Sequence, residues 1–183
     1  MLFLHLENIL LSKLKLNKQL RKLHYWISPF IFIPVLVIFS TGVLLQLKKQ
    51  SDWIQPPIQQ GVNSIPSIKF EEILEAAKSI PEAEIESWAD IDRIDVRPTD
   101  GISKIRSNNR WEIQIDNETK EILSVEYRRS DVIESVHDGS FFTNYVKFGW
   151  FLPAGILLVI MSLSGIYMFL LPLSVKGKKS KLK

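Results

Sequence analysis

Three histidines, His5, His24 and His137, are the side chains of this sequence best suited to ligate a metal ion. The sequence contains no cysteine, which excludes disulfides, cysteine-ligated zinc, iron–sulfur clusters and thiol catalysis. A histidine can equally have a purely structural role. Which role applies depends on the elements that hold these residues.

The carboxylates in the middle of the chain are candidates for acid–base catalysis. They form no recognisable catalytic pattern, because the sequence has no Ser-x-x-Lys, no glycine-rich phosphate loop and no nucleophile elbow. The segment 90–95 is faintly similar to a calcium loop but lacks its glycine and its closing glutamate. We interpret the carboxylates as solvated surface charge and assign no catalytic residue. They are Glu71, Glu72, Glu75, Asp90, Asp92 and Asp95.

Two long apolar runs, Tyr25–Leu47 and Phe148–Leu171, contain no Asp, Glu, Lys or Arg. As helices they would each be roughly 35 Å long, enough to cross a hydrocarbon core of about 30 Å. The first run is too long and too far from the N-terminus for a signal peptide, and no small-x-small cleavage site follows it. The sequence therefore predicts two transmembrane helices, the first of them an uncleaved anchor.

Charge is distributed unevenly along the chain. Residues 1–24 carry a net charge of +4 and the tail after Val175 carries +5, whereas residues 48–147 carry −6. The positive-inside rule places both basic ends in the cytoplasm and the acidic middle outside. Lys48 and Lys49 follow the first run and argue weakly for the opposite orientation.

The basic N-terminal arm has the spacing of an amphipathic helix, with Leu16, Leu20 and Leu23 at i, i+4 and i+7. Such a helix can lie on an anionic inner leaflet. The alternative is a solvated segment that only sets the topology. Neither basic end contains a nucleic-acid-binding motif, so we expect no nucleic-acid partner.

The segment between the runs predicts a small α+β domain. Apolar residues from Phe70 to Ile80 recur at helical spacing, and Pro81 ends the helix. Four short strands follow, linked as hairpins. Trp111, Ile113 and Ile115 alternate with polar residues, which is typical of a strand with one face in the core and one in solvent. The predicted strands are the segment from Ile91 to Val96, Ile102–Arg106, Trp111–Asp116 and Ile122–Tyr127.

The predicted fold class is thus α+β, with two transmembrane helices flanking a helix-plus-antiparallel-sheet domain. The predicted segments are a basic arm (1–24), transmembrane helix 1 (25–47), a Pro- and Gln-rich linker (48–66), the outer domain (67–129), a short helix with a His-Asp-Gly turn (130–147), transmembrane helix 2 (148–171) and a basic tail (172–183).

Several motifs together resemble the PepSY-associated transmembrane family, over nearly the whole chain. They are the entry motif 21–26 (RKLHYW), the Ser40-Thr41-Gly42 end of the first run, the segment 134–142 (ESVHDGSFF) and 163–167 (LSGIY) in the second run. The resemblance implies a membrane-anchored bacterial protein with an extracytoplasmic PepSY domain. Larger relatives have about four membrane helices, and several are linked to iron uptake and bind b-type haem through histidines, acting as reductases. With only two spans, this chain is not expected to be a self-sufficient reductase.

The resemblance makes His24 and His137 the candidate haem ligands. By the predicted topology His24 lies at the inner membrane edge and His137 beyond the outer edge, so the two cannot ligate one iron within a monomer. A C2 dimer would place each histidine opposite its own copy and create two haem sites stacked across the bilayer.

Other interpretations remain open. His24 is also explained as an interfacial residue, and His-Asp-Gly as a turn after a short helix capped by Ser130-Asp131, with Gly139 at positive φ. The chain is then a binding or regulatory module whose outer domain contacts a peptidase, a peptide or an envelope component. A third alternative is a structural subunit of a larger membrane complex.

Overall fold

The computed structural model describes the backbone of residues 2–180 and the side chains of residue 12 and residues 15–171. The chain forms two compact units, each described on its own below. A helical unit contains the residues up to Ser40 and those from Val136 onward, and an outer unit contains Thr41–Ser135. The α+β fold class, with two long apolar helices separated in sequence by a four-stranded antiparallel sheet, is confirmed.

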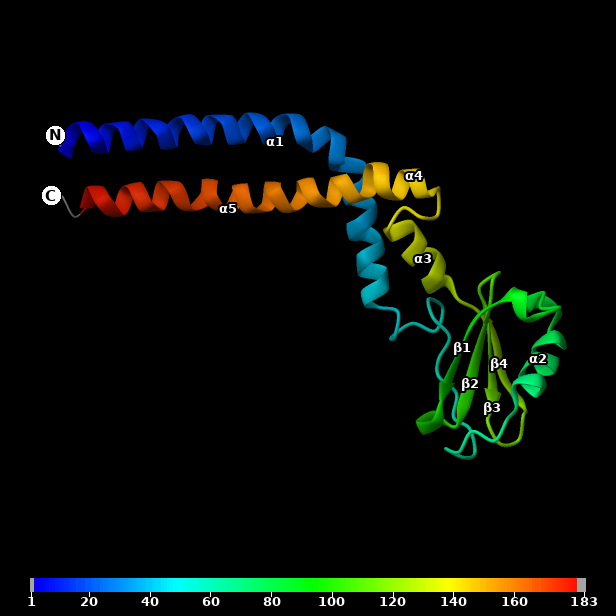
Figure 1. The fold of residues 1–183 in the computed structure, drawn as a ribbon. Coiled ribbons are helices and arrows are strands. Elements are labelled where there is room, and N and C mark those ends of the chain that lie inside the picture. Colours follow the sequence, from blue (N-terminus) through cyan, green and yellow to red (C-terminus); the bar gives the residue numbers. More distant parts are fainter. Residues whose placement is uncertain (1, 181–183) are drawn as a thin grey trace. The chain divides into compact units, whose positions relative to one another are not determined.

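Two long helices, α1 (Leu2–Gln46) and α5 (Leu152–Ser180), form most of the helical unit. The first part of α1 runs beside α5, with the beginning of α1 and the end of α5 at the same end of the pair (Figure 1). The stretches Lys15–Gln46 and Asn144–Leu171 are long and apolar enough to cross a membrane. The basic arm and the first apolar run form one helix that bends sharply partway along its length (Figure 1). Pro29 and Pro34 lie inside it, and each removes a backbone hydrogen bond.

Three short helical elements connect the outer unit to α5: α3 (Arg129–His137), α4 (Asn144–Val146) and a π-helical turn (Lys147–Phe151). The predicted short helix is present, but it begins at Arg129, so Ser130 and Asp131 lie in its first turn instead of capping it. The predicted positive φ of Gly139 is confirmed at 79°.

The outer unit contains one antiparallel sheet in the order β1-β2-β3-β4 (Figure 1). Its strands are β1 (Ile91–Arg97), β2 (Ile102–Ser107), β3 (Trp111–Asp116) and β4 (Ile122–Tyr127). Helix α2 (Phe70–Lys78) precedes them, and three 3-10 turns lie at Pro81–Ala83, Trp88–Asp90 and Pro98–Asp100. All five predicted elements are confirmed to within a residue or two at their ends.

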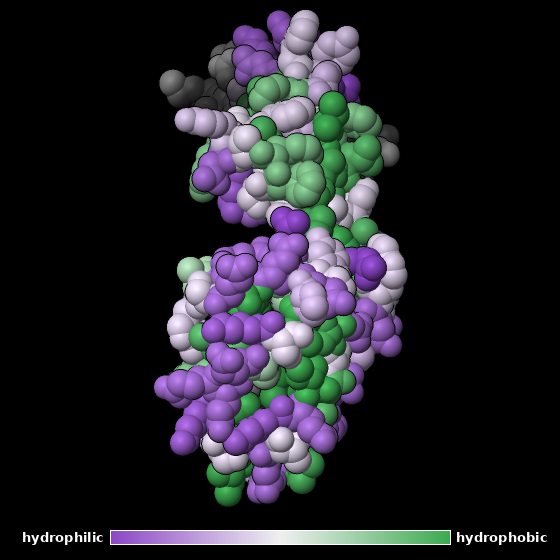
Figure 2. Space-filling view, turned by 90° about the vertical axis from the view of Figure 1, so that its right-hand side faces the viewer, coloured by the Kyte–Doolittle hydropathy of each residue, from purple (hydrophilic) through white to green (hydrophobic). Residues whose placement is uncertain are grey.

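One face of the sheet packs on α2 and forms the core of the outer unit. Ile105 and Ile113 are paired across β2 and β3, and they pack with Ile73 and Ala77 of α2. All four side chains are 2% exposed or less. Seen from outside, the outer unit is largely hydrophilic on the side drawn in Figure 2, with a hydrophobic strip between the polar side chains.

The other face of the sheet is polar, and it too is buried. Glu112 and Gln114 are completely buried, so the expectation of a solvent-facing side on β3 is wrong. The Pro- and Gln-rich segment covers this face: the Gln114 side chain donates to Pro57 O (2.8 Å) and accepts from Gln59 N (2.9 Å). The linker has no regular secondary structure, as predicted, but it is part of the packed domain.

Candidate functional site

His24 lies in α1 and faces α5. Its Nε2 is 2.7 Å from Ser164 Oγ, and Ser164 donates its only hydroxyl proton to Met161 O at 3.0 Å. The serine oxygen therefore accepts from His24, and in the neutral imidazole this leaves the lone pair on Nδ1. Gly165 lies beside this contact, and a Cβ added there would make an ordinary van der Waals contact with His24 Cε1 at 3.9 Å. His24 thus makes an interhelical polar contact while keeping one nitrogen able to bind a metal.

His137, the last residue of α3, lines an open groove of about 420 Å³ within the helical unit. Its walls come mainly from one side of the π-helical turn and α5, with one residue of α1. The polar members are His137, Asp138 and Lys147. The apolar members are Ile38, Phe148, Phe151, Leu152, Gly155, Ile156 and Val159.

A rigid turn places His137 at this groove. An added Cβ on Gly139 would lie 2.7 Å from the Phe151 ring, so the positive φ and the close ring both require glycine here. Asp138 accepts a hydrogen bond from Ser140 N (2.9 Å) and forms an ion pair with Lys147. Burial would raise the pKa of Asp138, but these hydrogen bonds outweigh it and lower the pKa below its ordinary value.

The two candidate histidines lie at different levels of the helix pair. His24 is level with Ser164, and the His137 groove begins at Phe148 and Phe151. At 1.5 Å per residue, the two levels are roughly 20 Å apart along α5. The structure therefore does not bring His24 and His137 together, as expected. The side chain of His5 lies outside the described residues, and the described part of the chain contains no group of three His, Cys, Asp or Glu side chains able to hold a metal.

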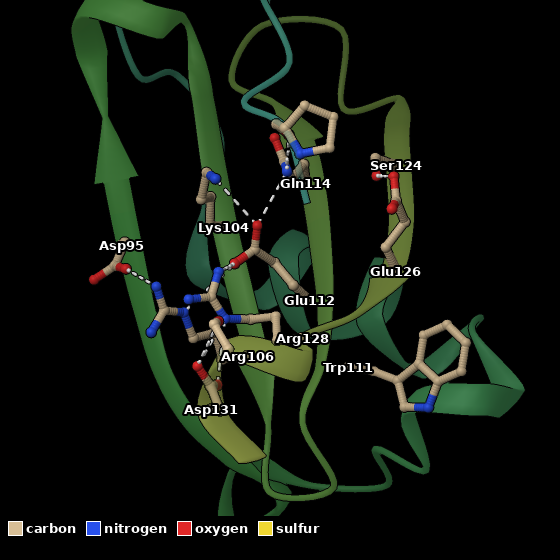
Figure 3. Close-up of polar contacts among 12 residues, drawn as sticks. Asp95, Lys104, Arg106, Trp111, Glu112, Gln114, Ser124, Glu126, Arg128 and Asp131 are labelled. Carbon is tan, nitrogen blue, oxygen red and sulfur yellow. Dashed lines mark hydrogen bonds and ion pairs between the residues drawn. The ribbon is translucent and has the colours of Figure 1, made fainter. Parts of the chain in front are cut away.

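A buried charge cluster on the polar face of the sheet was not foreseen from the sequence (Figure 3). Glu112 is at its centre and accepts from Lys104 at 3.0 Å, from Arg128 at 2.5 Å and from Gln114 at 3.0 Å. Arg106 Nε lies 3.5 Å from the second Glu112 oxygen. Desolvation lowers the pKa of Arg106 below its ordinary value.

This cluster is structural, because the partners already surround both oxygens of Glu112 and leave no room for a reacting group. Arg128 also contacts Asp131 of α3 at 3.2 Å, so the cluster connects the sheet to that helix. The signal in the sequence was the opposite charges on two strands joined by a short turn, and the observed register places Arg106 opposite Glu112 and Lys104 opposite Gln114. Opposite charges on facing strands predict a cross-strand pair.

The interpretation as surface charge holds for most of these carboxylates but not for Asp95, which pairs with Arg106 of the buried charge cluster at 3.3 Å. Glu71, Glu75 and Asp92 are exposed. Glu72 pairs with Lys120 at 2.6 Å, and Asp90 accepts from Ser87 N at 2.8 Å. The hydrogen bonds from Ser87 and Glu86 lower the pKa of Asp90.

Comparison with family models, with curated proteins and with solved structures found no match for this chain. The chemistry of the two histidine environments is therefore the basis for the functional proposal that follows.

Proposed function

We propose that this chain is a two-span protein of the bacterial inner membrane with an extracytoplasmic PepSY-like domain. Two long apolar helices support the membrane location. The beginning of α1 and the end of α5 lie at the same end of the helix pair, and the chain is basic in both regions, which supports cytoplasmic termini (Figure 1). The central acidic domain would then face the periplasm.

Within that membrane we propose an accessory role in haem-linked electron transfer, in the context of iron uptake. The observation that carries the proposal is the position of His137 at the polar end of an apolar groove. Apolar walls suit a macrocycle, an imidazole suits its iron, and Lys147, which pairs with Asp138, places a cation in the lining that suits a propionate. A bound haem b supplies a one-electron redox centre, and this chain would contribute its ligand, its apolar walls and the exclusion of water.

The monomer provides one histidine at each level, so low-spin bis-histidine ligation requires a second copy. A C2 dimer pairs His137 with its own copy at the outer level and His24 with its own copy at the inner level. At the inner level Ser164 holds one nitrogen of His24, and a ligand whose other ring nitrogen is hydrogen-bonded is fixed in orientation. Two such sites roughly 20 Å apart along α5 would form a path for electrons across the bilayer.

An absorbance spectrum of the full chain in mild detergent, oxidised and then reduced with dithionite, tests this proposal. We expect a Soret band with sharp α and β bands, reduced in His137→Ala and in His24→Ala and unchanged in His5→Ala, which serves as the control. Size-exclusion chromatography of each variant separates loss of haem from loss of fold. A protein that stays colourless after haem loading would exclude the haem proposal.

The second candidate is a binding or regulatory module without haem. Phe70 and Trp88 of the outer unit favour it, because their rings form an edge-to-face pair with a centroid distance of 6.2 Å although both side chains are about half exposed. Exposed aromatic pairs are typical anchors of protein interfaces. A colourless protein that co-purifies with an envelope peptidase, and loses it in Trp88→Ala but not in Trp53→Ala, would support this candidate.

A further inference from the structure

The outer unit contains a second cavity, of about 390 Å³, at the point where the chain leaves α1. Three cations, Lys48, Lys49 and Arg97, line it together with a single acid, Asp52. The lysines lie two and three residues after the end of α1 at Gln46. The cavity is thus a basic site next to the outer end of the first apolar helix.

The wall of this cavity is held in place by the sheet. Pro57, one of its lining residues, accepts a hydrogen bond from Gln114, whose side chain is completely buried. Next to it, Ile54 is buried and donates to Ser51 O at 3.0 Å, and Trp53 O accepts from Arg129 at 3.1 Å. A wall anchored in this way costs little further conformational entropy when a ligand binds.

Arg97 is only weakly paired at the cavity. Its acid partner Asp100 lies at a long 3.9 Å from Nη1, and the Arg97 side chain is 42% exposed. An anionic ligand in the cavity would give the guanidinium a closer, charge-assisted partner than Asp100 does.

We propose that this cavity binds a phosphate group, and that the source is the headgroup of an anionic phospholipid. Three cations around one acid select an anion, and the guanidinium of arginine matches phosphate oxygens. The site lies within three residues of the helix end, which is the depth of lipid headgroups if α1 spans the membrane. Binding of an anionic headgroup also explains why Lys48 and Lys49 lie on the outer side of the membrane in the proposed topology, where the positive-inside rule does not favour lysines. The lipid source rests on the proposed two-span topology, whereas phosphate recognition does not.

The test uses the full chain in a non-ionic detergent. Native mass spectrometry measures binding of dihexanoyl phosphatidylglycerol against dihexanoyl phosphatidylcholine, and calorimetry measures binding of inorganic phosphate against chloride. We expect phosphatidylglycerol to bind at least about tenfold more tightly than phosphatidylcholine, and Lys48→Gln/Lys49→Gln/Arg97→Gln to abolish the preference. The matched control Lys69→Gln/Lys78→Gln/Arg93→Gln removes the same charges from exposed positions of the same unit.

Binding of phosphatidylglycerol alone identifies the lipid headgroup, and additional binding of inorganic phosphate shows that the phosphate is sufficient. Equal binding of both lipids without phosphate binding, or equal loss in the cavity and control variants, would overturn the proposal. Carbonate extraction of membranes is measured in parallel. A chain released by carbonate contradicts the two-span topology, and the phosphate measurement then still decides whether the anion site exists.

Discussion

Neighbouring residues of β3, Glu112 and Ile113, show that the two faces of the sheet are buried in different ways. Both side chains are completely buried. Ile113 lies in the apolar core under α2, whereas Glu112 is surrounded by Lys104, Arg128 and Gln114. The apolar face gains from removing surface from water. The polar face is stable only as long as every charge keeps its partner.

The largest effect should come from Glu112→Ala. This change leaves the buried cations Lys104 and Arg128 without their shared anion, and we expect a loss of about 4 kcal/mol in the free energy of unfolding. Pulse proteolysis of the full chain across a urea series measures it for the outer unit. Glu118→Ala, in an exposed turn, is the control. A loss below about 1 kcal/mol would show that water hydrates the two cations in the variant and that the polar face is therefore accessible to solvent.

Ile113→Ala should cost slightly less, about 3 kcal/mol, from lost burial and the remaining cavity. Ile113→Val, measured by the same pulse proteolysis, should cost only about 1 kcal/mol because it removes a single methylene. The graded response is what distinguishes this face from the polar one, where loss of the single Glu112 charge leaves two buried cations unpaired at once. Equal losses for Ala and Val would contradict a close-packed core at this position.

A smaller effect is expected at Asp116, where the linker is held to the end of β3. Its carboxylate accepts from Thr119 N (2.8 Å), Glu118 N (2.7 Å) and Val62 N (2.7 Å). Asp116→Asn replaces one acceptor oxygen by a donor, and we expect a loss of about 1–2 kcal/mol at neutral pH.

The pH dependence of this loss follows from the pKa of Asp116. Hydrogen bonds from Thr119, and then from Glu118 and Val62, lower its pKa from the ordinary 3.8 despite burial. The stabilisation is therefore fully present above pH 3.8 and disappears as the pH falls through the lower, folded-state pKa. The difference in urea midpoint between wild type and Asp116→Asn should be constant from pH 7 to about pH 5 and narrow below pH 3.8. A difference that widens on acidification would contradict this assignment.

The sequence predicts the apolar face better than the polar one. Helical spacing from Phe70 and the alternation of Ile113 with Ile115 were sufficient for the elements and for the α2 side of the core. The burial of Glu112 could not be read in the same way, because it depends on Arg128, which comes from beyond β4, and on the linker, which covers the neighbouring Gln114 through Pro57 O. Alternation along one strand is the same whether the polar side faces water or a linker.

The same limit applies to the histidines. The motifs place His24 and His137 at opposite ends of the apolar runs, and the structure retains this separation. The hydrogen bond from His24 to Ser164 depends instead on which faces of two helices meet. No spacing within either helix contains that information.

The smallest effect should come from the ion pair that joins α2 to the turn before β4. Lys120 Nζ lies 2.6 Å from Glu72 Oε1, and its hydrogen bond, with that from Lys69 N, lowers the pKa of Glu72. The pair is open to solvent, where water and salt replace most of the interaction. Lys120→Gln should therefore leave the urea midpoint unchanged within error, while the pKa of Glu72, followed by NMR, rises toward 4.5. A measurable loss of stability would mean that charge also holds α2 on the apolar face, and the contrast between the two faces of the sheet would disappear.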